Sequence, residues 1–375
     1  MKAVGSSAAD PARIRVLVVD DSALMRQLLR QLIENDPELC VVDTASDPLQ
    51  AWNKIQSRTP DVLTLDVEMP KMDGLTFLDK LMRAQPLPVV MVSSLTEQGC
   101  DTTLRALELG AVDYVCKPQM DLAQGMHELA HELRQKLKVA ARARVQARLR
   151  SHSAPAPRKP SVSPRGLEGA RADARKVPGA KLDPSRTSPR VVAIGASTGG
   201  TEALKSVLTA LPPDAPGIVI VQHMPENFTR QFANRLNGLC RIEVREAADQ
   251  DRITPGLALI APGSHHMQVE KAVGGFRVRL QAGPPIDHHR PSVDVLFESC
   301  AKTIGAQALG VILTGMGSDG ARGLAAMRRS GAFTLGQDEQ TCVVYGMPKE
   351  ALLRGGVARQ APLGQIASLI VAHTR

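Results

Sequence analysis

The sequence predicts an α/β protein with two doubly wound, mainly parallel sheets, one in each half of the chain. Short apolar runs rich in Val and Ile alternate along both halves with segments that have the period of an amphipathic helix. Several of these runs end in Asp, Ser, His or a Gly-rich turn, which suits the sheet edge where parallel strands place their ligands. The segment between the halves holds hardly any large apolar residues, so each half is expected to fold around its own core.

Length and composition agree with this division. The chain has 375 residues, enough for two domains with full cores, and aromatic residues make up only 2%. Aliphatic side chains and Met must therefore fill those cores. The six Cys residues lie far apart and form no C-x-x-C pair, which is typical of reduced thiols in a cytosolic protein. Residues 1–13 are polar and no apolar run could cross a bilayer, so we expect a cytoplasmic protein without direct membrane insertion.

The formal net charge of +8 is concentrated in one segment. From Ala140 to Arg190 the chain carries 13 Lys and Arg residues against three acidic residues, a net charge of +10, which leaves −2 for the remainder. This segment is rich in Pro, Ser, Ala and Arg and cannot bury a core, so it is expected to be a flexible linker. Because both flanking domains are close to neutral, the charge does not indicate nucleic-acid binding. We expect a disordered N-terminus at residues 1–13, a first domain at 14–139, the basic linker at 140–189 and a second domain at 190–375.

The first domain is expected to contain five strands with helices between them. The predicted strands cover residues 13–21, the surroundings of 41–42, 60–66, 88–93 and 112–115. A helix from about Leu49 to Ile55 follows the second strand. The helix after the first strand is amphipathic, with one face formed by Leu24, Met25, Leu28, Leu29, Leu32 and Ile33.

Polar side chains follow the carboxyl ends of these strands: Asp20, Asp21, Asp66, Ser93 and Lys117. Several carboxylates together suit Mg²⁺, a hard cation that also binds phosphate oxygens. A nearby lysine can hold a phosphoryl oxygen as a point charge. This edge therefore predicts a Mg²⁺-assisted carboxylate nucleophile that accepts a phosphoryl group.

With these features, residues 14–120 resemble a two-component receiver domain. The matching marks are the Asp20-Asp21 pair, the stretch 66–74 (Asp-Val-Glu-Met-Pro-Lys-Met-Asp-Gly), Ser93 and the Lys117-Pro118 pair. The resemblance implies that Asp66 is the phosphoacceptor and that Asp20, Asp21 and Asp66 hold Mg²⁺. It also implies the side chains that respond to the phosphoryl group, which are Ser93, Lys117 and the switch aromatic Tyr114.

The second domain is organised around residues 191–200, Val-Val-Ala-Ile-Gly-Ala-Ser-Thr-Gly-Gly. An apolar strand breaks at Gly195, and a helix opens near Thr201. The turn between them places Ser197 in the pattern G-x-S-x-G, which is typical of a serine nucleophile on a tight strand-to-helix bend. A phosphate or dinucleotide cradle made of backbone N–H groups is the alternative. The motif alone leaves both chemistries open.

Two later strand ends favour the nucleophile. The strand over residues 217–222 leads into His223, where a dinucleotide fold would place Asp or Glu for the ribose hydroxyls. A third strand near residues 308–313 precedes the Gly-rich turn that carries Asp319. Because parallel strands share one carboxyl edge, Ser197, His223 and Asp319 are expected to meet there as a catalytic triad. Their order along the chain differs from the α/β-hydrolase order, which argues against that fold.

Other histidine patterns are weaker signals. Residues 127–131 match H-E-x-x-H, but no third metal ligand follows and the segment leads into the linker. A solvated face of a connecting helix is the better interpretation. The pairs His265-His266 and His288-His289 do not favour a metal site either, because neighbours in sequence point apart on a strand.

Residues 190–373 resemble the catalytic domain of the protein-glutamate methylesterase family of bacterial chemotaxis (CheB). The marks are the stretches 195–200, 222–225, 261–263 and 290–294 and the Asp319 turn. The resemblance implies hydrolysis of glutamyl methyl esters, and deamidation of certain glutamines, through an acyl-enzyme on Ser197. It implies that the backbone of Met316 contributes to the oxyanion hole and that the esterase chemistry needs no cofactor. The implied partners are the cytoplasmic domains of methylated chemoreceptors, as substrate, and the chemotaxis histidine kinase, as phosphodonor.

The two resemblances together lead to an expectation about regulation and leave two alternatives. We expect the unphosphorylated first domain to dock over the Ser197 edge and to block a bulky substrate. A response regulator with a DNA-binding second domain would need a basic, groove-fitting output domain, which the charge distribution does not support. A nucleotide-binding module that uses residues 195–200 as a phosphate cradle would bind nucleotide and show no esterase activity.

Overall fold

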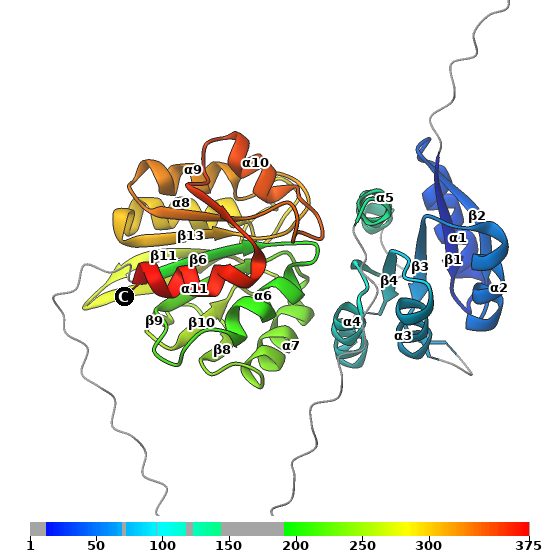
Figure 1. The fold of residues 1–375 in the computed structure, drawn as a ribbon, viewed down its shortest axis with the longest axis horizontal. Helices are drawn as coiled ribbons and strands as arrows, with labels where there is room; N and C mark the ends of the chain where they lie inside the picture. Colours follow the sequence, from blue (N-terminus) through cyan, green and yellow to red (C-terminus); the bar gives the residue numbers. More distant parts are fainter. Residues whose placement is uncertain (1–12, 70–72, 95, 118–122, 144–190, 375) are drawn as a thin grey trace, which may run out of the picture.

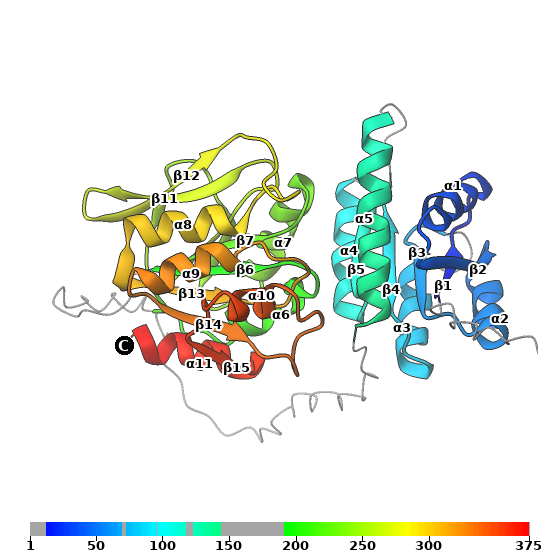
Figure 2. The ribbon, with the colours of Figure 1, turned by 90° about the horizontal axis from the view of Figure 1, so that it is seen from above.

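The computed structural model describes residues 13–69, 73–94, 96–117, 123–143 and 191–374. Two α/β domains lie side by side, and helices α4 and α5 of the first face the second (Figures 1 and 2). The expected N-terminal tail at residues 1–13, apart from Arg13, and most of the expected linker at 140–189 lie outside the described residues. None of the described helices is long and apolar enough to span a membrane.

The first domain is a five-stranded parallel sheet with the strand order β2-β1-β3-β4-β5. Its strands are β1 (Ile14–Val19), β2 (Leu39–Ala45), β3 (Val62–Asp66), β4 (Val89–Ser93) and β5 (Asp113–Cys116). Its helices are α1 (Ala23–Glu34), α2 (Pro48–Arg58), α3 (Gly74–Ala84), α4 (Glu97–Leu109) and α5 (Ala123–Ala141). Helices α1 and α5 pack on one face of the sheet, and α2, α3 and α4 pack on the other.

Local sequence signals set the helix boundaries of this domain. The side chains of Ser22, Asp47, Asp73 and Thr96 accept a hydrogen bond from the N–H three residues ahead, which caps the N-termini of α1 to α4. Helix α4 ends at Gly110, whose φ of 108° suits glycine. The predicted strands and helices are confirmed, with shifted boundaries.

The apolar face predicted for helix α1 is buried only in part. Leu29, Leu32 and Ile33 are buried, whereas Leu24, in the first turn of the helix, is 67% exposed. The helical period alone cannot show where along a helix the core ends.

The second domain is built on a seven-stranded parallel sheet with the order β15-β14-β13-β6-β7-β10-β8. Its strands are β6 (Val191–Ala196), β7 (Gly217–Gln222), β8 (Glu243–Glu246), β10 (Leu257–Ile260), β13 (Ala308–Ile312), β14 (Phe333–Gln337) and β15 (Arg359–Ala361). A separate antiparallel sheet contains β11 (His266–Ala272), β12 (Gly275–Gln281) and β9 (Arg252–Ile253). The domain is therefore mainly parallel, as predicted.

Helices cover both faces of the seven-stranded sheet (Figure 1). Helices α6 (Gly200–Thr209), α7 (Glu226–Asn237) and α11 (Leu363–Thr374) lie on one side. Helices α8 (Val293–Thr303), α9 (Ala321–Arg329) and α10 (Met347–Leu353) lie on the other, and a short 3₁₀ helix at Gly305–Gln307 precedes β13. This two-layer cover accounts for the continuous apolar sequence of the central strands β6, β7 and β13, which are fully buried.

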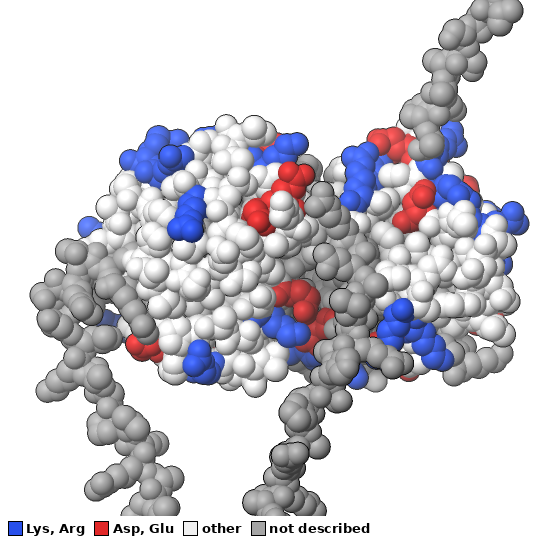
Figure 3. Space-filling model, in the orientation of Figure 1, with Lys and Arg blue, Asp and Glu red and all other residues white. Residues whose placement is uncertain are grey.

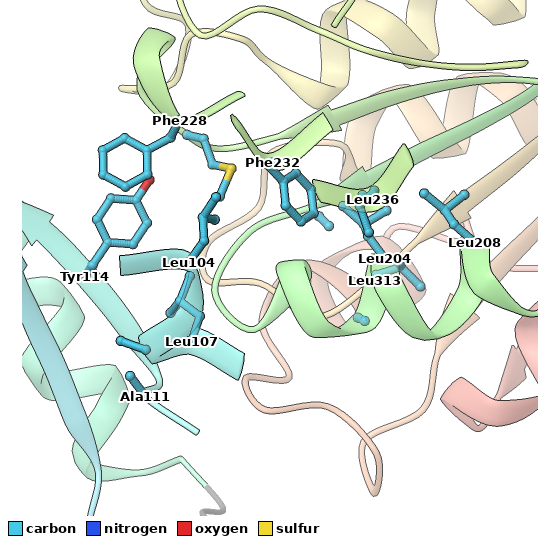
Figure 4. Close-up of a cluster of buried hydrophobic side chains, with 14 of the residues drawn as sticks. Leu104, Leu107, Ala111, Tyr114, Leu204, Leu208, Phe228, Phe232, Leu236 and Leu313 are labelled. Carbon is cyan, nitrogen blue, oxygen red and sulfur yellow. The ribbon is translucent and has the colours of Figure 1, made fainter. Parts of the chain in front are cut away.

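The two domains share one apolar cluster. Leu104, Leu107 and Tyr114 of the first domain belong to the same group of buried side chains as Phe228 and Phe232 of the second. Figure 4 shows the rings of Tyr114 and Phe228 next to each other, with Leu104 nearby. The domains are therefore held together by packed side chains as well as by the connecting chain.

Candidate functional site

Three neighbouring strands of the large sheet bring the predicted triad to one edge. Ser197 follows β6 and His223 follows β7, and these strands pair in parallel with Ala196 opposite Gln222. Asp319 lies in the loop between β13 and α9, and β13 pairs with β6 on its other side. The convergence that the sequence predicted is therefore present, because β13, β6 and β7 are adjacent in the sheet.

Asp319 and His223 form a buried pair. The Nε2 atom of His223 lies 2.8 Å from Oδ2 of Asp319, and Asp319 is only 1% exposed. Because the carboxylate accepts, Nε2 carries the proton and donates. The other ring nitrogen, Nδ1, is buried and has no hydrogen-bond partner among the described residues. The imidazole is therefore held in one tautomer with a free lone pair on Nδ1.

The N-terminus of α8 surrounds the carboxylate of Asp319 with hydrogen-bond donors. Oδ1 accepts from Ser292 Oγ at 2.9 Å and from the N–H of Asp294 at 3.0 Å, and Oδ2 accepts from the N–H of Val293 at 2.7 Å. Burial raises the pKa of Asp319, but His223 and these N–H groups outweigh it and hold the pKa well below its ordinary value. Asp319 is therefore an anion fixed in place by the stretch 290–294 that the sequence singled out.

Backbone contacts hold the Ser197 turn from two sides. The N–H of Ser197 donates to the carbonyl of Thr314 at 3.1 Å, and the amide of Gln222 donates to the carbonyl of Ser197 at 2.9 Å. A Cβ on Gly315 would lie 2.8 Å from the Cβ of Ser197, so only glycine permits this approach. The turn that carries Met316 therefore lies against the serine. Among the described residues, the hydroxyl of Ser197 forms no hydrogen bond to His223.

His289 is part of this site, and the sequence did not reveal it. Its ring stacks on His223 with centroids 3.8 Å apart and an interplanar angle of 9°. Burial, and then the nearby His223, lower the pKa of His289 to about 3, so its ring is neutral at physiological pH. The tight turn before it holds two non-glycine residues at positive φ, Asp287 (47°) and His288 (67°), a strained conformation that is typical of functional sites.

The remaining histidine patterns contain no metal site among the described residues. His266 is buried, accepts at Nδ1 from the N–H of Ser292, and its Nε2 donates to the carbonyl of Pro284. It therefore supports the loop that leads to His289. In the H-E-x-x-H pattern, the side chains at positions 127 and 128 lie outside the described residues, and His131 is exposed on α5.

The edge of the smaller sheet gathers the predicted carboxylates. Ligand oxygens of Asp20, Asp21 and Asp66 all lie within 4.8 Å of one another. The Nζ atom of Lys117 lies 2.8 Å from Oδ2 of Asp66 and 3.6 Å from Oδ2 of Asp20. The sequence therefore predicted correctly that these four side chains meet. The rest of the matching stretch, at 70–72, and Pro118 lie outside the described residues.

Charge crowding makes this edge a good place for a divalent cation. Burial, and then the charge of Asp66, raise the pKa of Asp20 to about 6. The pKa of Asp66 is raised as well, mainly by burial, although Lys117 opposes the shift. Oδ2 of Asp20 is buried without a hydrogen-bond partner among the described residues. Clustered carboxylates with an unsatisfied oxygen fit the ligand preference of Mg²⁺.

The two other predicted sensing residues form contacts with neighbours other than Asp66. The hydroxyl of Ser93 is within hydrogen-bond distance of the carbonyls of Ser94 and Gly99, both at 3.3 Å, and accepts from Thr103. Tyr114 is 4% exposed and stacks on Phe228 of the second domain, with ring centroids 4.5 Å apart and an interplanar angle of 20°. Their sensing roles stay predictions.

A polar contact joins the first domain to the residue after the nucleophile. The hydroxyl of Thr198 donates a short hydrogen bond to Oδ2 of Asp113. The other oxygen of that carboxylate lies 3.1 Å from the Nζ atom of Lys136. The first domain therefore contacts the Ser197 turn through Asp113 of β5. That this docking blocks a bulky substrate stays a prediction.

Comparisons with known proteins match both parts of the chain. Residues 16–129 match the family model described as response regulator receiver domain. Residues 192–370 match the family model described as CheB methylesterase. The two matches fall in the two domains of the structure.

Curated relatives match nearly the whole chain. A protein from Geobacter metallireducens named protein-glutamate methylesterase/protein-glutamine glutaminase 1 is 54% identical, over 94% of this chain and 94% of its own. A Pseudomonas aeruginosa protein, protein-glutamate methylesterase/protein-glutamine glutaminase 2, is 52% identical over 96% of each chain. The crystal structure of the Thermotoga maritima CheB methylesterase catalytic domain is 35% identical, with a TM-score of 0.48, over 49% of this chain and 98% of that chain.

Proposed function

This chain belongs to the CheB methylesterase family, and on that premise we propose that it removes methyl esters from glutamate side chains of chemoreceptors under the control of phosphorylation. We further propose that it deamidates specific receptor glutamines and works in the cytoplasm. The proposal rests above all on the His223–Asp319 pair, 2.8 Å apart beside Ser197, with a receiver domain packed over that edge. The names of the relatives support the same substrate class.

The chemistry follows from the site's own atoms. Nδ1 of His223 takes the proton of the Ser197 hydroxyl as the oxygen attacks the γ-carbonyl of the ester. Asp319 keeps the proton on Nε2 and stabilises the imidazolium. The protonated imidazole then returns the proton to the methoxy oxygen, methanol leaves, and an acyl-enzyme remains. Water activated by His223 releases glutamate, and a glutamine substrate gives the same acyl-enzyme with ammonia as the leaving group.

The oxyanion needs donors that the fold has not already used. The N–H of Ser197 donates to the carbonyl of Thr314, so it does not serve. The N–H of Met316 forms no hydrogen bond among the described residues, and its turn packs against Ser197 through Gly315. We therefore assign Met316 to the oxyanion hole, where one donor contributes about 2.7–4 kcal/mol to transition-state stabilisation.

In the receiver, we propose that Asp66 accepts the phosphoryl group from the chemotaxis histidine kinase. Asp20, Asp21 and Asp66 would hold Mg²⁺, which neutralises phosphoryl oxygens during transfer. Lys117, already 2.8 Å from Asp66, would hold one phosphoryl oxygen. Ser93 and Tyr114 would then turn from their present contacts and weaken the domain contact.

The docked receiver is the inhibited form in this proposal. Its Asp113 is bonded to Thr198, directly beside the nucleophile, and Tyr114 covers Phe228. Methanol release from a methylated chemoreceptor, measured with and without a small phosphodonor, tests the activity and its control together. The fragment 190–375 should be more active than the unphosphorylated full chain. Equal activities would exclude inhibition by docking and leave the esterase assignment intact.

Ser197→Ala tests the nucleophile. It should reduce methanol release on the order of 10⁴-fold or more, because it removes the oxygen that forms the acyl-enzyme. His223→Ala should be nearly as severe because triad members act as a unit. A Ser197→Ala protein that keeps a substantial fraction of turnover, with an unchanged melting temperature, would contradict the assignment.

A further inference from the structure

Two cations of the catalytic domain lie on helices that start beside the nucleophile and the base. Helix α6, which carries Lys205, begins three residues after Ser197, and α7, which carries Arg235, begins three residues after His223. Between them lie the apolar side chains of Phe232 and Leu236 on α7. We call this surface, formed by Lys205, Phe232, Arg235, Leu236 and Leu239, the α6–α7 strip.

The receiver covers the strip with an acidic face of helix α4. Nε of Arg235 donates to Oε1 of Glu108 at 2.8 Å, and its Nη1 lies 3.4 Å from Oδ1 of Asp101. Lys205 reaches the same Glu108 at 3.3 Å. The hydrogen bond from Arg235 is the main reason why the pKa of Glu108 is lowered. Figure 3 shows acidic and basic side chains adjoining at the junction of the domains.

The residues that α4 uses share one side of the helix. Asp101, Leu104 and Glu108 are spaced i, i+3, i+7, so two carboxylates flank one apolar side chain. Leu104 is buried and shares the lining of a small hollow with Phe232 and Leu236 of the strip. Leu239 lines the same hollow and is 50% exposed. Part of the apolar surface of the strip therefore stays accessible with α4 in place.

The chain after α4 continues to the catalytic turn. Asp113 follows the end of α4 by four residues, and its carboxylate accepts from Thr198, next to Ser197. When α4 lies on the strip, the chain that follows it therefore places the acidic side chain of Asp113 beside the nucleophile. A polypeptide whose glutamyl side chain must reach Ser197 needs the same space, and both carboxylates that pair with Arg235 leave with the receiver.

We propose that the α6–α7 strip is the docking surface for an acidic helical segment of the protein substrate, and that receiver helix α4 occupies it as a substitute for that segment. The inference rests on the proposed function. Charge complementarity selects the occupant. Arg235 is paired with two carboxylates of α4, and Lys205 reaches Glu108 although it also lies 3.4 Å from Glu202 of its own helix, so an acidic helix with an apolar centre fits the strip. Release of the receiver then exposes the binding surface for the substrate and also opens the way to Ser197.

The test compares the two ends of one ion pair in the full-length protein. Glu108→Gln and Arg235→Gln both remove the Glu108–Arg235 pair, so both should raise methanol release without a phosphodonor. Steady-state kinetics on a methylated chemoreceptor cytoplasmic fragment, with acetyl phosphate and Mg²⁺ present, separates them. Arg235→Gln should raise KM about fivefold or more with kcat retained, which corresponds to about 1 kcal/mol, while Glu108→Gln should keep the wild-type KM.

Two further measurements complete the test. Added salt should raise the wild-type KM more than the KM of Arg235→Gln, because screening acts on the charge that the variant lacks. Lys205→Gln should raise KM as well and replaces Arg235→Gln if that protein is unstable. Equal KM values for Glu108→Gln and Arg235→Gln, or for Glu108→Gln and Lys205→Gln, would overturn the proposal. If the wild-type protein releases no methanol at all, the proposed function itself is wrong.

Discussion

The two sheet edges of this molecule carry buried aspartates in opposite electrostatic states. At the catalytic edge, Asp319 is surrounded by four donors, and its pKa lies well below the ordinary value. At the receiver edge, Asp20 and Asp66 face each other with Lys117 as the cation between them, and both pKa values are raised. The residue type is the same at both edges, and all three aspartates lie at the carboxyl side of a parallel sheet, so the donors supplied by neighbouring elements make the difference.

This difference matches the work that each edge would do. A base that accepts a proton in every turnover needs a fixed counter-charge before substrate arrives, and the N-terminus of α8 fixes Asp319 in that state. A phosphoacceptor needs charge that becomes balanced only when a cation and a phosphoryl group bind. The receiver edge is therefore electrostatically unsatisfied by itself, which couples its state to its ligands.

The largest effect in this comparison is expected from the same substitution at the two edges. Asp319→Asn should lower kcat about 10³- to 10⁴-fold, somewhat less than Ser197→Ala, because Asp319 orients and stabilises the imidazolium without carrying a proton. Asp66→Asn should instead keep the activity low when phosphodonor is present. Methanol release with and without phosphodonor measures both.

The melting temperatures of these variants serve as the control. Asn in place of Asp319 would direct an amide group at donors that need an acceptor, so Asp319→Asn should also lower the melting temperature. Asp66→Asn removes one of the crowded carboxylates and should not lower it in the absence of Mg²⁺. If both variants lost activity to the same degree irrespective of phosphodonor, the two edges would not have the separate roles described here.

A smaller effect is expected on the pH dependence of receiver stability. Because the folded-state pKa of Asp20 is raised to about 6, ionisation of Asp20 destabilises the fold increasingly as pH rises from about 4 to about 6. Asp319, with its lowered pKa, contributes stability that is constant over this range and is lost only at lower pH. Acidification from pH 7 to 5 should therefore stabilise the receiver relative to an Asp20→Asn variant.

The single tryptophan makes this measurement selective. Trp52 lies on α2 of the receiver, packed against its core, so its fluorescence reports on the unfolding of that domain. The melting temperature of the wild-type protein should rise on addition of Mg²⁺ at pH 7, and that of Asp20→Asn should rise less. A pH-independent difference between the two proteins, together with equal Mg²⁺ responses, would show that Asp20 is not held in a crowded charge cluster.

The sequence predicted the architecture and the convergence of the site residues for a clear physical reason. Strands of a parallel sheet end on one edge, so Ser197, His223 and Asp319 could be brought together from their strand-end positions alone. The same reasoning grouped Asp20, Asp66 and Lys117. These predictions needed only the direction of each strand, which alternation with helices determines.

The remaining features depend on contacts between distant segments. His289 closes the irregular turn at 286–289, where no periodic pattern predicts that its ring covers His223. The pairing of Arg235 with Glu108 depends on how two separately folded domains dock, and the sequence of neither domain encodes that register. The adjacent pair His288-His289 gave no sign of this stacking contact, because ring stacking has no sequence pattern.

The smallest effect concerns the hydroxyl of Tyr114, at the contact between the receiver and the catalytic domain. This hydroxyl is buried against the catalytic domain and has no hydrogen-bond partner among the described residues, whereas the ring stacks on Phe228. An unsatisfied buried hydroxyl destabilises the docked form by about 1–3 kcal/mol, and undocking would return the hydroxyl to water.

Tyr114→Phe should therefore strengthen docking and lower the basal methanol release by up to about fivefold, which corresponds to a docking free energy more favourable by about 1 kcal/mol. Tyr114→Ala, which removes the stacked ring, should raise basal release, so the two variants should lie on opposite sides of the wild type. If Tyr114→Phe raised basal release as Tyr114→Ala does, the hydroxyl would itself stabilise the docked form, and the receiver would be held there by a polar contact rather than by the packed ring.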